Sequence, residues 1–472
     1  MTSVLRKWSW LFIPFVVASL FFMVNLSRLP LEDADEATYA LVAQDLYADG
    51  GWARLSLFGE DWIDKPPLHF WSMKVSATLF GWNEGALRVP SALAGITAIL
   101  LLAGITYELT RKKEAAMIAA LILIFFPLFL AAARNVRMDI PVTATMLGAL
   151  YCFMRGRSHP WFLVGVGLFI GIGFLFKSVV VLLIIPVLVF FAFLYKERCL
   201  FLRKEFWLGI VLCVAVTLPW FLIAQSNYGG EFFGRFFGSQ IGRVSVNAIS
   251  SGISNGYLSW VFFKYGAPWS VASLLVLAWY ALGFKKRTVD GERRSAWQTM
   301  TFALGSCALI AFPFLLSTTK LVTYLIPVYP FVVLFLAGLY AYLMSGTSEW
   351  KLRTRAGIIL CFIVALFPTM REAFGDGVLY VSRASADEKE IGLSLADAPE
   401  KIPALLYEFP GDQAIQYYAR RRVEHLREEA AWPLTPPFYL VIPSSLIEEN
   451  DWLRAFSPSY KGEYLSLFPI TR

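Results

Sequence analysis

The chain has 472 residues, of which 57% are hydrophobic and 16% charged, and its formal net charge is +7. An ordinary soluble domain has about 25% charged residues, so this composition excludes a purely soluble protein and indicates a polytopic membrane protein. The basic residues form short clusters between apolar runs, which argues against nucleic acid as a partner and is typical of topology signals. The five cysteines lack the paired spacing of a metal site or a disulfide framework.

Apolar runs recur along most of the chain, and a spanning helix needs about 20 mostly apolar residues. The first run follows a basic start and has no small-residue cleavage site, so we expect a retained helix and not a removed signal peptide. The runs predict about eleven transmembrane helices, near residues 8–27, 88–108, 115–133, 140–154, 160–176, 178–195, 206–225, 257–284, 299–317, 321–344 and 356–370.

The positions of lysine and arginine predict which loops face the cytoplasm. If the N-terminus is cytoplasmic, every strongly basic loop falls on the inner side, near residues 111–113, 155–157, 196–204, 285–294 and 351–355. The segments at 28–87, 134–139, the junction at Lys177-Ser178, 226–256 and 318–320 then lie on the outer side with the C-terminal tail after about residue 371. The polar residues outside the basic loops are concentrated on this outer face.

Two regions outside the apolar runs have their own organisation. The first outer loop, 28–87, is too long for a simple connector, and its helical spacing and aromatic residues predict amphipathic helices along the membrane interface. After residue 370 charged residues become frequent and apolar runs shorten to strand length, as at 404–407 and 438–443. We therefore expect a transmembrane module over 1–370 and a small soluble α/β domain over 371–472.

Acidic residues follow the first apolar run, in the segment Asp33-Ala34-Asp35-Glu36-Ala37-Thr38-Tyr39. They can cap the helix that begins there, or they can be part of a reaction site at the membrane face. Asp64 and Lys65 precede a rigid Pro-Pro turn in the same outer loop. That pair is either an exposed ion pair worth at most about 1 kcal/mol or a second part of the site.

Further charged residues stand at the outer ends of other apolar runs. Asp139 lies where a helix begins, which allows a helix N-cap with arginine partners, and interfacial lysines commonly extend their amines towards water. Taken together, however, the cations predict a site for an anionic amphiphile, because guanidinium and ammonium groups bind phosphate. These cations are Arg88, Arg134, Arg137, Lys177 and Lys320.

Six collinear motifs resemble those of membrane glycosyltransferases of the GT-C superfamily. The similar branch contains the bacterial lipid A aminoarabinose transferases and the protein O-mannosyltransferase-like enzymes, families 39 and 83, and the resemblance covers about residues 8–345. The motifs are Asp35-Glu36-Ala37-Thr38-Tyr39, Asp64-Lys65-Pro66-Pro67, the segment from Ala86 to Leu93 around Arg88, Arg137-Met138-Asp139, Phe176-Lys177-Ser178, and the segment from Lys320 through Tyr324 to Pro327.

The resemblance implies a mainly α, polytopic GT-C fold in the bacterial inner membrane. It implies an inverting transfer of a sugar from a polyprenyl-phosphate donor to a lipid A, glycan or protein acceptor at the periplasmic face. Asp35 would be the principal catalytic or acceptor-positioning carboxylate and Asp139 a second acid, with Lys65, Arg137 and Lys320 near phosphate. The other expected substrate-binding residues are Glu36, Tyr39, Asp64, Arg88, Arg134, Lys177 and Tyr324.

Two departures from the family pattern affect the cofactor prediction. Gln240 stands where related enzymes have a histidine that can help to bind a metal, and Asp64 replaces the more usual glutamate. Because an amide is a poor zinc ligand, we expect no metal cofactor. A transporter or flippase of a lipid-linked substrate is the alternative function, but it predicts polar residues near mid-helix. A scaffold protein would leave the outer-facing cations unexplained.

Overall fold

A computed structural model describes residues 9–32, 34–242, 256–283, 291–317, 320–345, 348–375, 384–426, 436–448 and 450–471. The chain forms two compact units. We call Met1–Leu26, Ile63–Ser72 and Arg88–Leu379 the membrane unit, and Ser27–Trp62, Met73–Leu87 and Tyr380–Arg472 the sheet unit. The sheet unit combines two parts of the first predicted loop with the C-terminal segment. The predicted domain boundary at residue 370 stays a prediction.

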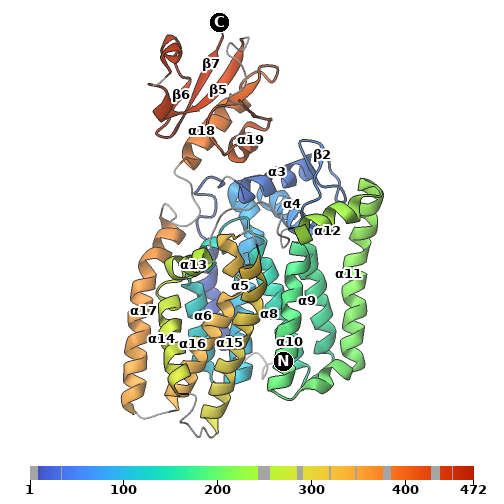
Figure 1. The fold of residues 1–472 in the computed structure, drawn as a ribbon, viewed down its shortest axis with the longest axis vertical. Helices are drawn as coiled ribbons and strands as arrows, with labels where there is room; N and C mark the ends of the chain where they lie inside the picture. The colour runs from blue at the N-terminus through green and yellow to red at the C-terminus, as the bar shows by residue number, and fades with distance from the viewer. Residues whose placement is uncertain are drawn as a thin grey trace. The chain divides into compact units, whose positions relative to one another are not determined.

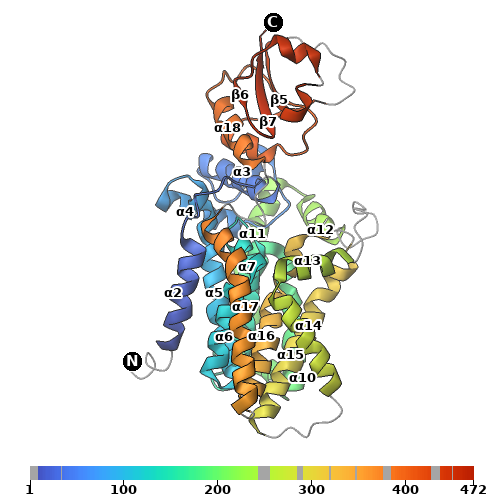
Figure 2. The ribbon, with the colours of Figure 1, turned by 90° about the vertical axis from the view of Figure 1, so that its left-hand side faces the viewer.

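Long apolar helices make up the membrane unit, and Figures 1 and 2 show many of them running side by side. They are α2 (Phe12–Met23), α5 (Glu84–Thr110), α6 (Lys113–Ile124), α7 (Pro127–Ala133), α8 (Asp139–Arg155), α9 (Phe162–Lys177), α10 (Ile184–Leu194), α11 (Lys204–Tyr228), α12 (Phe232–Gly242), α13 (Gly256–Gly266), α14 (Trp269–Gly283), α15 (Glu292–Leu316), α16 (Tyr329–Met344) and α17 (Ser348–Phe374). Short 3-10 helices precede or join some of them: η1 (Ser9–Leu11), η2 (Ser178–Leu183), η3 (Arg198–Leu202) and η4 (Val322–Leu325).

Among the described residues, six helices are long and apolar enough to cross a membrane, or up to eight if each of two bent pairs is one span. The chain is therefore a multi-pass membrane protein. The number is below the predicted eleven because several apolar runs do not form one straight helix. Helices α6 and α7 meet at 68° before Pro127, and α13 and α14 meet at 114° beside Pro268. Proline lacks the amide hydrogen that a continuous helix requires.

Two further differences in the number of spans concern the run at 160–195 and the first helix. The runs predicted at 160–176 and 178–195 lie in one apolar stretch, Phe162–Leu194, that is interrupted at Lys177 and Ser178. Ser178 has a φ of +55°, a backbone conformation that L-amino acids rarely adopt, so α9 ends there. Helix α2 and its preceding turn form only a shorter apolar segment, Ser9–Met23.

Helices α8 and α16 are buried along almost their whole length, whereas α11 is mostly exposed, as expected for a helix that faces lipid. Helices α9 and α11 approach closely because glycines face each other. A Cβ atom on Gly167 would overlap the carbonyl group of Gly209. Small residues at such positions allow transmembrane backbones to pack closely.

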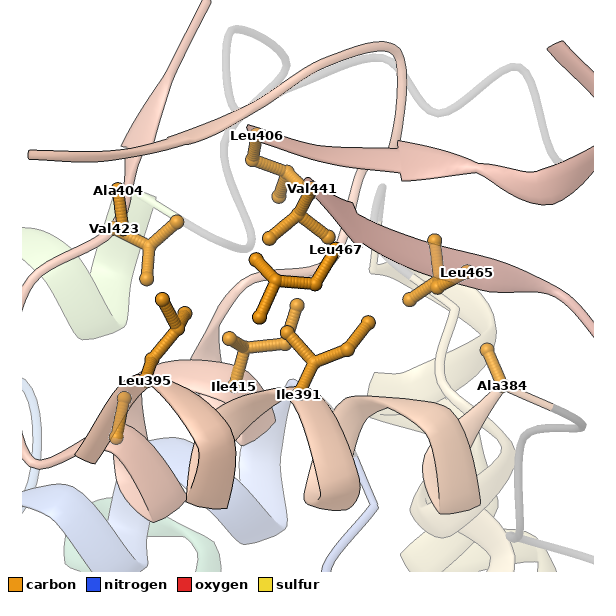
Figure 3. Packing of buried hydrophobic residues seen from close by; sticks show 11 residues of the cluster. Ala384, Ile391, Leu395, Ala404, Leu406, Ile415, Val423, Val441, Leu465 and Leu467 are labelled. Carbon is orange, nitrogen blue, oxygen red and sulfur yellow. The ribbon is translucent and has the colours of Figure 1, made fainter. Parts of the chain in front are cut away.

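The sheet unit contains a five-stranded mixed sheet with the strand order β4-β3-β5-β7-β6. Strand β3 (Ala404–Leu406) is parallel to β4 (Glu424–His425) and β5 (Phe438–Pro443), while β7 (Leu465–Ile470) is antiparallel to β5 and to β6 (Tyr460–Lys461). Helices α18 (Ser385–Ala396) and α19 (Gln413–Ala419) cover one face. Figure 3 shows Ile391 and Leu395 of α18 packed towards Val441 and Leu467 of the sheet.

The first-loop part of the sheet unit holds helix α3 (Asp35–Ala48) and the short hairpin of β1 (Ser56–Leu57) and β2 (Glu60–Asp61). Helix α4 (Leu68–Phe80) begins in the membrane unit and ends in the sheet unit. Two short 3-10 helices, η5 (Ser444–Leu446) and η6 (Asp451–Ala455), follow β5. Helix α3 contacts α19, so the first-loop and C-terminal segments of this unit pack together.

Candidate functional site

A buried ion pair joins two helices of the membrane unit. Asp139 is the first residue of α8 and Lys177 the last residue of α9, and Lys177 Nζ lies 2.5 Å from Asp139 Oδ1. The two side chains are only 7% and 14% exposed, respectively. The alternative in which Asp139 is an N-cap with arginine partners is wrong, because Asp139 forms its ion pair with Lys177 and Met138 occupies the cap position without a side-chain cap. A buried pair of this kind fixes both charges in place.

His69 lies beside this ion pair at the start of α4. Its side chain is fully buried, and its ring centroid is 6.3 Å from that of Phe176, the neighbour of Lys177. Burial, together with the positive charge of Lys177, lowers the pKa of His69 to about 3, so the imidazole is neutral near pH 7. His69 is not among the residues predicted from the sequence, because the three histidines of the chain are too scattered to form a metal site. Its place directly after the Asp64-to-Leu68 motif is the signal that could have found it.

Asp64 and Lys65 form a second charge pair just before α4. Lys65 Nζ contacts Asp64 Oδ2 and donates to the Asp64 carbonyl oxygen at 3.3 Å. Lys65 is only 4% exposed, whereas Asp64 is 35% exposed. The alternative of a fully exposed surface pair is therefore wrong for the lysine. The ammonium group is held in a sheltered position by a carboxylate that still reaches water.

The three predicted arginines differ in their contacts. Arg134 donates to the carbonyl oxygens of Phe21 (2.7 Å), Val24 (2.8 Å) and Ala373 (2.9 Å), and so ties α7 to segments near α2 and α17. Such bonds to main-chain carbonyls indicate a structural role for this guanidinium. Arg88 donates to the Leu26 carbonyl oxygen at 2.8 Å.

The backbone of Arg137 contacts Ser91. Its amide nitrogen lies 3.2 Å from Ser91 Oγ, and the same hydroxyl lies 3.3 Å from the Arg137 carbonyl oxygen. Ser91 follows Arg88 in the third motif, so the structure brings the third and fourth motifs into contact. Arg137 is buried, with 7% of its surface exposed.

Lys320 follows the C-terminal end of α15, and its side chain reaches back to that end. Its Nζ donates to the carbonyl oxygens of Ser317 at 2.5 Å and Leu315 at 3.4 Å, and the residue is 6% exposed. A cation is stabilised there by the last carbonyls of the helix. Tyr324, in η4, stacks on Phe314 with ring centroids 4.8 Å apart.

Asp35, Glu36 and Tyr39 belong to the sheet unit. Helix α3 begins at Asp35 after Ala34, which has a φ of +69° and makes no side-chain cap. The acids therefore lie in the first turn, where the helix dipole favours negative charge, and neither is the N-cap residue. Glu36 is buried and accepts a hydrogen bond from the Glu32 amide at 2.8 Å, whereas Asp35 remains half-buried. Asp33 lies outside the described residues.

Tyr39 completes the motif on α3. It is 6% exposed, and its ring meets that of Trp62 edge to face with centroids 6.3 Å apart. Tyr39 and Glu36 thus help to hold the start of α3 in its fold. Asp35 is the more exposed carboxylate of the two in the motif.

The membrane unit contains most of the predicted site. It brings Asp139 to Lys177 and Asp64 to Lys65, and its candidate cations outnumber its candidate carboxylates. Within the described residues no three His, Cys, Asp or Glu side chains are grouped to hold a metal ion. The prediction that no metal cofactor is needed remains a prediction. The membrane-unit candidates are Asp64, Lys65, Arg88, Arg134, Arg137, Asp139, Lys177, Lys320 and Tyr324.

Comparison with solved structures identifies the fold. The crystal structure of ArnT from Cupriavidus metallidurans bound to undecaprenyl phosphate matches with a TM-score of 0.71 and 18% identity, over 98% of each chain. The chain has the GT-C fold. Its resemblance to the aminoarabinose transferase branch of GT-C proteins, expected from the six motifs, is confirmed.

Sequence comparisons agree with this GT-C assignment. Residues 64–223 match the family model described as dolichyl-phosphate-mannose-protein mannosyltransferase. An undecaprenyl phosphate-alpha-4-amino-4-deoxy-L-arabinose arabinosyl transferase 2 of Pseudomonas fluorescens is 27% identical over 69% of this chain and 55% of its own length. A corresponding transferase of Pseudomonas aeruginosa is 28% identical over 68% of this chain and 57% of its own. The alignments thus span just over half the length of these curated relatives.

Proposed function

We propose that this GT-C protein is an inverting glycosyltransferase that moves a sugar from a polyprenyl-phosphate donor to a lipid A, glycan or protein acceptor. The observation that carries the proposal is the buried Lys177–Asp139 pair, which fixes an ammonium group in a membrane unit rich in sheltered cations. A lipid phosphate has the charge to meet such cations while its tail lies among helices. The relatives named as undecaprenyl-phosphate arabinosyl transferases support this donor class.

Glycosyl transfer from a lipid phosphate breaks the bond between the anomeric carbon and the phosphate oxygen. Positive charge develops on the sugar, and negative charge increases on the departing phosphate. Fixed cations stabilise that change more than they stabilise the ground state, which lowers the barrier. We assign this role to Lys65 and Lys177, with Arg137 and Lys320 as further phosphate-binding candidates. Asp139 positions the Lys177 ammonium.

Asp35 is the proposed acceptor-side carboxylate. A hydroxyl acceptor requires a base, and a half-buried aspartate at a helix start can take its proton as the new glycosidic bond forms. A phosphate acceptor is already anionic, so with lipid A the same residue would orient the acceptor or the sugar. In both cases a single displacement inverts the anomeric carbon. Glu36 and Tyr39 support Asp35 from the same helix.

The proposal includes the topology predicted from the basic loops. The helices would cross the bacterial inner membrane with the N-terminus in the cytoplasm, the reaction would take place at the periplasmic face, and residues 371–472 would form a periplasmic domain. A reporter fused after residue 472 tests this arrangement. Activity of a periplasm-specific reporter supports the topology, and activity of a cytoplasm-specific reporter contradicts it.

The function is tested in a bacterial host that makes polyprenyl-phosphate sugars. Lipids and glycans are isolated with and without the expressed chain and compared by mass spectrometry. We expect one product whose mass increases by a single sugar residue, and no such product with the Asp35→Ala or Lys65→Ala variant. An unchanged set of masses with well-folded protein would contradict the proposal.

A further inference from the structure

A cleft of about 560 Å³ lies wholly within the sheet unit. Its walls come from α3, the turn between α4 and α5, helix α18 and the C-terminal end of α19. Its volume is in the range of about 300–1,000 Å³ typical of small-molecule sites. None of the residues assigned to glycosyl transfer lines it.

Three polar groups in the cleft lack partners among the described residues. The buried indole N–H of Trp82 donates to no described group. The side chains of Gln44, half-buried on α3, and Arg420, exposed after α19, have no hydrogen bond or ion pair to any described residue. A buried polar group is usually satisfied, so the Trp82 N–H indicates a missing acceptor such as a ligand hydroxyl. Gln44 and Arg420 are reached by solvent and are available to bind further hydroxyls of the same ligand.

The charges that line the cleft are balanced. Lys389 Nζ lies 2.7 Å from Glu84 Oε1, and the Tyr418 hydroxyl donates to the same oxygen at 3.0 Å. The charges of Lys389 and Glu84 therefore compensate each other. The remaining lining charges contribute equal numbers of cations and carboxylates. This balance favours a neutral ligand over a phosphate or a polyamine. The remaining charges are Arg420, Arg421, Asp397 and Glu400.

Three aromatic residues, Trp82, Tyr417 and Tyr418, also line the cleft. Trp82 packs against Tyr47 with ring centroids 5.2 Å apart, and Tyr417 and Tyr418 meet edge to face at 5.0 Å. Trp and Tyr each combine an apolar ring with a hydrogen-bonding group. Such rings pack against the apolar C–H faces of a sugar, while mixed donors and acceptors bind its hydroxyls.

We propose that this cleft binds a neutral stretch of saccharide in a glycosylated acceptor. The assignment of that saccharide to the acceptor rests on the proposed glycosyltransferase function, whereas saccharide binding itself does not. The cleft would hold the acceptor through sugars that do not react, and Asp35 would act elsewhere in the same unit. Binding energy from such remote groups is commonly used to position the reacting group.

The test measures binding to the full-length protein in nanodiscs. The probe is an end-labelled oligosaccharide built only of uncharged sugars, titrated by equilibrium dialysis. We expect saturable binding that weakens about tenfold, or about 1.4 kcal/mol, in Arg420→Gln and in Trp82→Phe. Trp82→Phe removes the N–H together with the five-membered part of the indole and keeps a six-membered aromatic ring beside Tyr47, so it should leave the fold intact.

Arg422→Gln is the matched control, because Arg422 pairs with Glu60 outside this cleft. This variant should bind the probe as tightly as the unmodified protein does. Absence of saturable binding, or equal affinity in all variants, would overturn the proposal. Stronger binding of an unstructured peptide than of the oligosaccharide would overturn it in favour of a peptide site. Asp35→Asn should still bind the probe, so loss of transfer activity and loss of saccharide binding are distinguished.

Discussion

Lys177 at the end of α9 and Asp139 at the start of α8 form an ion pair of 2.5 Å that is largely buried. Removing one partner of such a pair leaves the other charge buried and uncompensated. We therefore expect Asp139→Asn or Lys177→Gln alone to destabilise the protein by about 3–5 kcal/mol. The double variant should regain much of the stability because both charges are gone.

Thermal unfolding of the four proteins in detergent, followed by fluorescence, measures this coupling. The double variant should stay inactive although its melting temperature recovers, since the cation for the phosphate is lost. If the loss of stability in the double variant equals the sum of the losses in the two single variants, the two side chains do not interact.

Lys65 and Arg134 are assigned different roles: Lys65 binds the substrate phosphate, and Arg134 supports the fold. We expect Lys65→Ala to lose at least about 2.7 kcal/mol of transition-state stabilisation, or about 100-fold in kcat/KM, with a small change in Tm. Arg134→Ala loses three bonds to main-chain carbonyls, so it should lower Tm and leave the KM for the lipid donor unchanged. Steady-state kinetics and thermal melting, measured on both variants, distinguish the two roles. A lower Tm in Lys65→Ala and a lower kcat/KM in Arg134→Ala would contradict the assignment.

The lowered pKa of His69 makes the stability of the folded protein depend on pH. Its folded pKa of about 3 lies below its unfolded value of 6.5, so the unfolded chain binds more protons between these limits. Stability is therefore complete above about pH 6.5 and falls as the pH decreases towards 3, by up to about 1.4 kcal/mol per unit. His69→Gln should flatten the dependence of Tm on pH between 7 and 5. An unchanged slope in that variant would exclude His69 as its source.

The close contact of α9 and α11 depends on Gly167. Its Cβ position is occupied by the backbone of Gly209, so Gly167→Ala should force the helices apart and cost about 1–3 kcal/mol. Gly357 on α17 has no atom within 4 Å of its Cβ position. Gly357→Ala is therefore the matched control and should not lower Tm. Equal melting temperatures for both variants would contradict the packing.

The sequence predicted the membrane class well because apolar runs and charge clusters depend only on composition along the chain. It predicted the number of spans less well because a run of apolar residues does not reveal where a helix bends, as it does near Pro127 and Pro268, or where it breaks, as it does at Ser178. The position of Asp139 at a helix start was visible in the sequence, but its pairing with Lys177, which is distant in sequence, was not. Likewise, the contacts of Arg134 with main-chain carbonyls have no sequence pattern.

The central claim is transfer of a sugar from a lipid phosphate with Asp35 on the acceptor side. The most direct measurement uses purified protein in liposomes with a radiolabelled polyprenyl-phosphate sugar and a defined lipid A acceptor. We predict labelled acceptor and free polyprenyl phosphate in equal amounts, and loss of both products in Asp35→Asn despite normal folding. Intact donor with the unmodified protein, or unchanged transfer by the folded Asp35→Asn variant, would contradict the account.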